Sequence, residues 1–139
     1  MKKLFASVPM RGRTEEEIRE SFAKMKRIAE TYEGEELELI DTWIAEDPPE
    51  GVRTSAVWYL GKSLEMLSTA DVYIGVSTYG YFPGCCVEEE VAQLYKIKRY
   101  HVYAMDIIPN WNELMQRLSA LERTYFRKNV LLHEICRSA

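Results

Sequence analysis

The sequence predicts an α/β protein, a doubly wound parallel sheet of four to five strands with helices on both faces. Short apolar runs alternate with longer amphipathic stretches along the chain, and this alternation is typical of strands that parallel crossovers connect. Right-handed crossovers place such helices on both sides of the sheet. The length of 139 residues, with 47% apolar and 29% charged residues, suits one globular domain over residues 1–139.

The first strand and helix have clear boundaries. Residues 2–8 are a short apolar run that ends before Pro9, which favours a strand followed by a turn. Thr14 and Glu17 have the spacing of a capping box, and Gly34 favours the end of the helix. The buried stripe that the spacing predicts contains Ile18, Phe22, Met25, Ala29 and Tyr32.

Residues 37–41 alternate as a strand does, and the prolines and glycine of residues 45–54 keep the next segment irregular. Thr54 or Ser55 can cap a second helix. Its predicted stripe contains Val57, Leu60, Leu64 and Leu67.

Residues 71–77 are apolar enough for a strand buried on both faces, and a loop rich in glycine and tyrosine follows at 78–84. A third helix, a strand at 100–105 and a last helical stretch after Pro109 complete the pattern, while residues 123–139 fit a short strand or a helix turn. The predicted buried residues of the last two helices are Val87, Val91, Leu94 and Tyr95, then Leu114, Leu118 and Leu121.

Composition limits the partners that we expect. The net charge of −4 argues against binding to a nucleic-acid polymer. We expect a cytoplasmic protein without a membrane partner, because no run approaches the length of a membrane span and the start lacks a signal pattern. Cys85 and Cys86 are adjacent, which does not match the spacing of zinc ligands, so no metal or cofactor is expected.

Ligands of doubly wound folds bind beyond the carboxyl ends of the strands, which places residues 8–13, 41–54 and 77–84 at one mouth. The turn from Pro9 to Arg13 is a candidate anion site, because Gly12 lets the backbone approach a ligand and arginine can grip a phosphate with two bonds. The glutamates at 15–17 oppose this reading unless they point outward. The candidate binding residues of this turn are Pro9, Met10, Arg11, Gly12 and Arg13.

Other side chains at the mouth can contact a substrate or simply pack. Three aromatic residues can stack on a planar group of a ligand, and the serines at two strand ends can donate hydrogen bonds. The alternative is that they are semi-exposed packing aromatics and ordinary strand-end serines. The candidates are Trp43, Tyr79 and Tyr81, then Ser7 and Ser77, together with Gly84 at the start of the third helix.

Three consecutive glutamates in the third helix cannot all face the mouth, since each helical step turns the side chain by about 100°. Glu88 shares a flank with Ala92 and lies near the helix N-terminus, where the dipole favours an ionised carboxylate, the form that a nucleophile needs. The alternative is a solvated acidic residue that complements the dipole, the reading that we apply to Glu89 and Glu90.

The chain resembles the nucleoside 2-deoxyribosyltransferase-like family, in a small uncharacterised branch related to nucleoside monophosphate N-glycosidases. The matching segments are FASVPMRG, WYLGKSLEMLSTADVYIGV and GCCVEEEVAQLY, between residues 4 and 95. The resemblance implies a flavodoxin-like fold and cleavage of an N-glycosidic bond. It implies that Glu88, four residues before Ala92, attacks the anomeric carbon, and that Asp71 contacts the base or orients other groups. Asp71 precedes its strand, however, and the topology therefore favours a turn role for it.

The sequence also departs from this family. The acidic residue that its better-studied members have six positions before the nucleophile is replaced by Phe82. A protein that binds a nucleotide or a nucleotide-derived signal without turnover is therefore the alternative to a hydrolase or transferase. A flavin-binding relative is disfavoured, because PMRGR lacks the hydroxyl residues of such a phosphate turn. Self-association into a homodimer or larger homo-oligomer is expected through the TYGYF loop or the tail.

Overall fold

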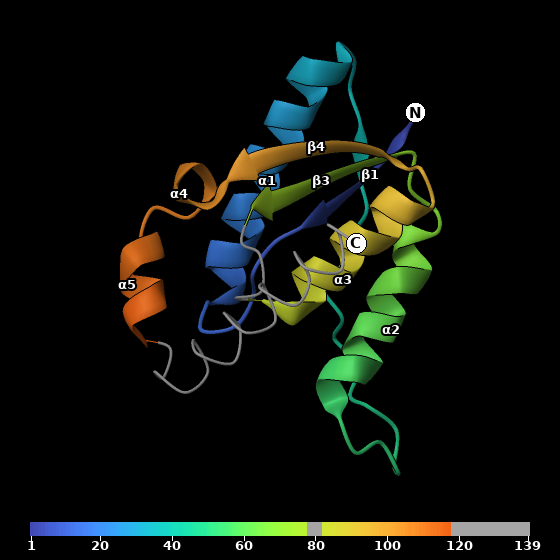
Figure 1. Cartoon of the computed structure of the whole chain (residues 1–139), viewed down its shortest axis with the longest axis vertical. Helices are drawn as coiled ribbons and strands as arrows, with labels where there is room; N and C mark the ends of the chain where they lie inside the picture. The colour runs from blue at the N-terminus through green and yellow to red at the C-terminus, as the bar shows by residue number, and fades with distance from the viewer. Residues whose placement is uncertain (78–81, 118–139) are drawn as a thin grey trace, which may run out of the picture.

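The computed structural model describes residues 1–77 and 82–117 and shows a sheet of four parallel strands (Figure 1). The strands are β1 (Lys3–Ser7), β2 (Glu38–Leu39), β3 (Val72–Ser77) and β4 (Lys98–Tyr103). Their order across the sheet is β2-β1-β3-β4, and every neighbouring pair is parallel. The predicted doubly wound α/β fold is confirmed.

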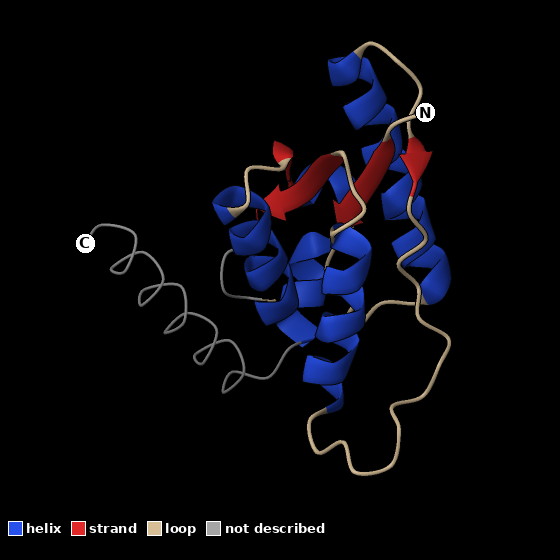
Figure 2. Ribbon diagram, turned by 90° about the vertical axis from the view of Figure 1, so that its right-hand side faces the viewer, coloured by secondary structure: helices blue, strands red, loops and turns tan. Residues whose placement is uncertain are grey.

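The helices form layers on both faces of this sheet. Helix α1 (Glu15–Glu33), the short α4 (Ala104–Ile107) and α5 (Trp111–Arg117) cover one face. Helices α2 (Ser55–Leu67) and α3 (Pro83–Leu94) lie side by side on the other (Figure 1). The segment between β2 and α2 is a long loop that runs away from the sheet (Figure 2).

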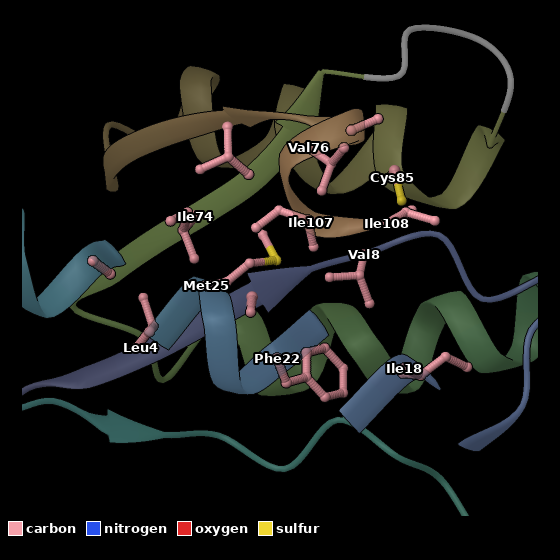
Figure 3. Packing of buried hydrophobic residues seen from close by; sticks show 14 of the residues in the cluster. Leu4, Val8, Ile18, Phe22, Met25, Ile74, Val76, Cys85, Ile107 and Ile108 are labelled. Atoms are coloured by element: carbon pink, nitrogen blue, oxygen red, sulfur yellow. The ribbon is translucent and has the colours of Figure 1, made fainter. Parts of the chain in front are cut away.

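Successive side chains of each strand point to opposite faces of the sheet, so the interior consists of two cores, one on each face. Leu4, Ala6 and Val8 point to the α1-side core, where Met25 and Ile74 also pack (Figure 3). Phe5 and Tyr73 belong to the smaller α3-side core, which α2 and α3 close. Ser7 is opposite Gly75 in the register, and Gly75 is opposite His101, so these three residues form one row across β1, β3 and β4.

Helix α1 begins and ends as predicted. Thr14 accepts a hydrogen bond from the Glu17 amide, the Glu17 side chain accepts one from the Thr14 amide, and Gly34 follows with φ of 73°. The predicted stripe is buried except for Tyr32, which is 60% exposed and stacks on Tyr100.

The predicted stripes of the other two long helices are partly wrong. In α2 only Leu67 is buried, and Val57 is 64% exposed. In α3 Val87, Leu94 and Tyr95 are exposed, whereas the buried residues are Cys85, Glu88 and Ala92. Ala92 packs with Phe5, Leu67 and Tyr73, because its small side chain lets α3 approach the sheet closely. This rotation of α3 turns Glu88 inward.

The segment after β4 forms the short helices α4 and α5 and not a single helix. Leu114 of α5 is buried as predicted, while Leu118, Leu121 and the segment 123–139 lie outside the described residues. Among residues 1–77 and 82–117, no helix has the length and apolar character that a membrane span requires.

Candidate functional site

Glu88 is a buried carboxyl that two serine hydroxyls hold from different elements. Its side chain comes from α3, and the residue is 8% exposed. Ser7, the last residue of β1, donates a hydrogen bond of 2.7 Å to Glu88 Oε1. Ser63 of α2 donates one of 2.6 Å to Oε2. The two bonds fix the plane of the carboxyl between the sheet and both helices.

Burial dominates the electrostatics of this carboxyl. Removal from water raises the pKa of Glu88, and the hydrogen bonds from Ser63 and Ser7 oppose that rise without cancelling it. The sequence suggested that the helix dipole would keep Glu88 ionised. Glu88 lies beyond the first turn of α3, however, where the influence of the dipole has fallen off.

Ser7 is the centre of a polar cluster under α3. Besides Glu88, two further groups lie near the Ser7 hydroxyl, the Cys85 thiol and the Tyr73 phenol. Burial raises the pKa values of both groups, which therefore keep their protons at neutral pH. The tip of the Tyr73 side chain lies over Gly75, where a Cβ would be 2.4 Å from the phenol oxygen.

Glu89 is not the solvated acid that the sequence suggested. Its carboxylate accepts from Arg99 Nη1 at 2.6 Å and pairs with His101 Nε2 at 2.7 Å, both on β4. Burial raises the pKa of Glu89, but contacts with His101 and Arg99 outweigh this and lower it below its usual value. Consecutive glutamates of α3 thus reach two different strands, β1 and β4.

Arg13 supports the turn from within, because its guanidinium donates to neighbouring groups of the chain itself. It donates to the Pro9 carbonyl at 2.9 Å, the Glu17 carbonyl at 3.1 Å and Ser21 Oγ at 2.6 Å. Burial lowers the pKa of Arg13, with Glu17 opposing. Nη1 and Nη2 thus bind the chain itself, whereas the buried Nε has no hydrogen-bond partner among the described residues. This use of Nη1 and Nη2 opposes the prediction that Arg13 grips a phosphate with two bonds.

Replacing Arg13 by alanine is expected to destabilise the fold, because two backbone carbonyls and Ser21 lose a charged donor. Hydrogen bonds to a charged group contribute about 1.5–3 kcal/mol, so a loss of about 2 kcal/mol in the free energy of unfolding is expected. Urea denaturation measures it. Arg53→Ala, at an exposed position in the loop before α2, is the matched control, and an equal loss in both variants would contradict the internal role.

Packing also explains Gly12. Its φ of 76° favours glycine, and an added Cβ would be 3.1 Å from Leu114 Cδ1 of α5. The close approach that the described residues show at Gly12 is thus to α5. Pro9 is buried, whereas Met10 and Arg11 are exposed, so these two side chains are the part of the turn that faces solvent.

Asp71 is remote from Glu88. It precedes β3 and accepts a hydrogen bond of 2.8 Å from the Lys3 amide, at the amino ends of β1 and β3. Ser7 and Glu88 meet at the carboxyl end of β1. The structure therefore does not bring Asp71 and Glu88 together, and the turn role that the topology favoured agrees with the placement of Asp71.

The other candidates lie in varied surroundings. Trp43 is half-buried against the α1-side core, the packing role that was its alternative. Its neighbour Thr42 is buried, and its hydroxyl has no hydrogen-bond partner among the described residues. Gly84 is the second residue of α3, and Ser77 ends β3. Tyr79 and Tyr81 lie outside the described residues.

Sequence reasoning missed Ser63, Tyr73 and the pairing of Glu89. A signal for Ser63 existed: it precedes the buried Leu67 by four residues, as Glu88 precedes the buried Ala92. A polar residue at that spacing lies on the buried side of its helix. In the described ranges, no three His, Cys, Asp or Glu side chains lie close enough to hold a metal ion.

The comparisons with known proteins add no assignment, since no family model, curated protein or solved structure matches this chain.

Proposed function

We propose that the chain cleaves or transfers at the N-glycosidic bond of a nucleoside or nucleoside 5′-monophosphate, with Glu88 as the nucleophile. The observation that carries the proposal is the buried Glu88 carboxyl, held by Ser7 and Ser63 at the carboxyl end of β1. Buried carboxyls with raised pKa values at the ligand-binding edge of a parallel sheet are frequent at functional sites. The resemblance to the nucleoside 2-deoxyribosyltransferase-like family supplies the reaction class.

The proposed reaction has two steps. A Glu88 carboxylate oxygen bonds to the anomeric carbon while the carbon–nitrogen bond breaks. The electron pair of the broken bond leaves with the base, which takes a proton from solvent. Water, or the nitrogen of a second base, then attacks the anomeric carbon and releases the carboxylate. Each carboxylate oxygen accepts one serine hydroxyl and keeps a further lone pair, so the anchoring bonds do not block the attack.

Phosphate recognition, if the substrate is a monophosphate, falls to Arg11 and not to Arg13. The Arg11 side chain is exposed in the β1–α1 turn, whereas the Arg13 side chain is half-buried. A single arginine in a solvent-facing turn suits a terminal phosphate. Arg11→Gln is then expected to raise KM for the monophosphate and leave KM for the nucleoside unchanged.

A product assay tests the proposal. The protein is incubated with ribo- and 2′-deoxynucleosides and their 5′-monophosphates, with and without an acceptor base, and chromatography detects free or exchanged base. Release that Glu88→Gln abolishes supports the assignment. Absence of products over the whole panel, or equal release by both proteins, removes it.

The rate is expected to rise with pH. The ionised form of Glu88 is the nucleophile, and burial raises its pKa, so the reactive form is scarce below that value and accumulates as pH passes through it. Measuring kcat/KM against pH for the most reactive substrate shows this as an acidic limb. A flat profile across the acidic range would contradict an essential carboxylate.

The alternative is a protein that binds a nucleotide without turnover. It is favoured by Phe82, which replaces the family's acidic residue and packs in the α1-side core with its ring 6.0 Å from that of Trp111. Calorimetry that detects tight binding of a nucleotide recovered intact supports this alternative. Absence of any nucleotide binding excludes it.

Self-association also remains a prediction. The TYGYF loop and the tail lie largely outside the described residues, but α2 and α3 expose Val57 and Leu94, the latter 65% exposed. Apolar side chains on outward helical faces favour contact with another subunit. Sedimentation equilibrium at several concentrations measures it, and a monomer throughout would contradict it.

A further inference from the structure

We propose that Tyr73 is a positioning residue for Glu88: its hydroxyl donates to Ser7, and Ser7 in turn donates to the Glu88 carboxyl. Tyr73 lies on β3, one strand from Ser7, and neither the spacing of the sequence nor the reaction proposed above requires it. The proposal deepens that function and rests on it for its kinetic consequence alone.

The Tyr73 phenol lies over the row of residues formed by Ser7, Gly75 and His101. Gly75 is the register partner of Ser7, and the Tyr73 oxygen lies over Gly75, where a side chain would otherwise stand. Tyr73 reaches this position because side chains two residues apart on a strand share a face. Its ring stacks on Phe5, with centroids 6.1 Å apart and planes 12° apart, which fixes the direction of the hydroxyl.

The direction of each hydrogen bond follows from the donor inventory. A serine hydroxyl has one proton and two acceptor lone pairs. Because Ser7 gives its proton to Glu88 Oε1, any bond between Ser7 and Tyr73 has the phenol as donor. Burial raises the pKa of Tyr73, so the phenol keeps the proton that it donates.

The other polar groups around the Tyr73 phenol are less suited to donate a hydrogen bond to Ser7. On α3, Cys85 offers a thiol, which is a much weaker donor to Ser7. Both oxygens of Glu89 already have partners on β4. The polar and titratable groups that face the cluster are Ser7 from β1, Ser63 from α2, Cys85, Glu88 and Glu89 from α3, and Arg99 and His101 from β4.

A chain of hydrogen bonds that ends on a carboxyl polarises in favour of the ionised form. The phenol therefore strengthens the donation from Ser7 and lowers the pH at which Glu88 becomes a nucleophile. Removal of the phenol oxygen leaves the Ser7–Glu88 bond but weakens it, so Glu88 holds its proton to higher pH.

The first test uses the wild-type chain and no substrate. Carbon-13 NMR of protein labelled at glutamate and tyrosine is recorded across the pH range, with the Glu88 Cδ and Tyr73 Cζ signals assigned. The Tyr73 signal is expected to shift at the midpoint of the Glu88 titration, whereas Tyr100, on the opposite face of the sheet and bonded to Glu33, does not follow it. A Tyr73 signal that ignores the Glu88 midpoint overturns the proposal.

The second test compares Tyr73→Phe with Tyr100→Phe. In Tyr73→Phe the Glu88 midpoint is expected to move to higher pH, and in Tyr100→Phe it stays in place. A midpoint that is unchanged or lower in Tyr73→Phe overturns the relay. If Tyr73→Phe does not fold, the NMR titration of the wild-type chain still tests the proposal.

The kinetic test applies where the wild-type chain turns over a substrate. Tyr73→Phe is expected to lower kcat/KM about three- to tenfold at neutral pH, the range of one net hydrogen bond, with the acidic limb moved to higher pH and KM little changed. A rate loss with no displacement of the acidic limb indicates a purely structural effect and overturns the relay. If the wild-type chain has no activity, the proposed function fails while the NMR result still stands.

Discussion

Replacing Glu88 by glutamine is expected to abolish base release, with a fall in kcat of at least about 10³-fold, because glutamine cannot form the glycosyl ester. The substitution keeps the size of the side chain, and an amide can still pair with Ser7 and Ser63. Steady-state release of base, measured by chromatography, gives the effect. The matched control is Glu65→Gln, a substitution of an exposed glutamate of α2 that is expected to leave the rate unchanged.

The stability of Glu88→Gln is expected to move in the opposite direction. The pKa of the Glu88 carboxyl is higher in the folded chain than in the unfolded chain. The free energy of unfolding of the wild type therefore falls as the pH rises from the unfolded-state pKa to the folded-state pKa. An amide has no such cost, so at neutral pH Glu88→Gln is expected to be at least as stable as wild type. Urea denaturation measures this. A variant that is both inactive and markedly less stable would assign Glu88 to the fold and not to a reaction.

Replacing Gly75 by alanine is expected to destabilise the fold by about 1–3 kcal/mol, the range for overpacking a well-filled core. The new Cβ would be 2.4 Å from the Tyr73 oxygen and 2.8 Å from two ring carbons. The ring has little room to retreat, because it is buried and stacks on Phe5. Thermal and urea unfolding measure the loss.

Gly61→Ala is the control for that substitution. Gly61 lies within α2, and an added Cβ there meets no atom within 4 Å. Because glycine weakens a helix relative to alanine, Gly61→Ala is expected to stabilise the chain by about 0.5–1 kcal/mol. The same chemical change thus has opposite signs at the two positions. A stabilised Gly75→Ala would mean that the Tyr73 ring does not lie over Gly75.

The fold could be predicted because its signals are local. Thr14 with Glu17 fixed the start of α1, and Gly34 fixed its end. The apolar run of β3 indicated a strand buried on both faces, and the alternation of strands and helices required a parallel sheet. None of these inferences depends on which face of a helix packs against the sheet.

The rotation of α3 could not be predicted from apolar periodicity. Val87 and Leu94 appeared to mark the buried face, yet both are exposed, and Ala92 is the fully buried residue that packs on the sheet. A glutamate counts as polar in a periodicity analysis and is therefore assigned to the exposed face, even where neighbouring hydroxyls donate hydrogen bonds to its buried carboxyl. Ser7 and Ser63 lie 56 residues apart in the chain, so no local pattern reveals that they share one carboxyl.

The attachment of Ser63 to α2 has a consequence for motion. Apart from Leu67, the side chains of α2 are not fully buried, and the helix begins after a long loop that runs away from the sheet (Figure 2). Segments with few buried contacts open at lower free energy than the rest of a fold. Each opening of α2 releases Ser63 from Glu88 and leaves the carboxyl with Ser7 alone. Hydrogen exchange at the amides of α2 therefore measures how often one half of the Glu88 anchor is absent.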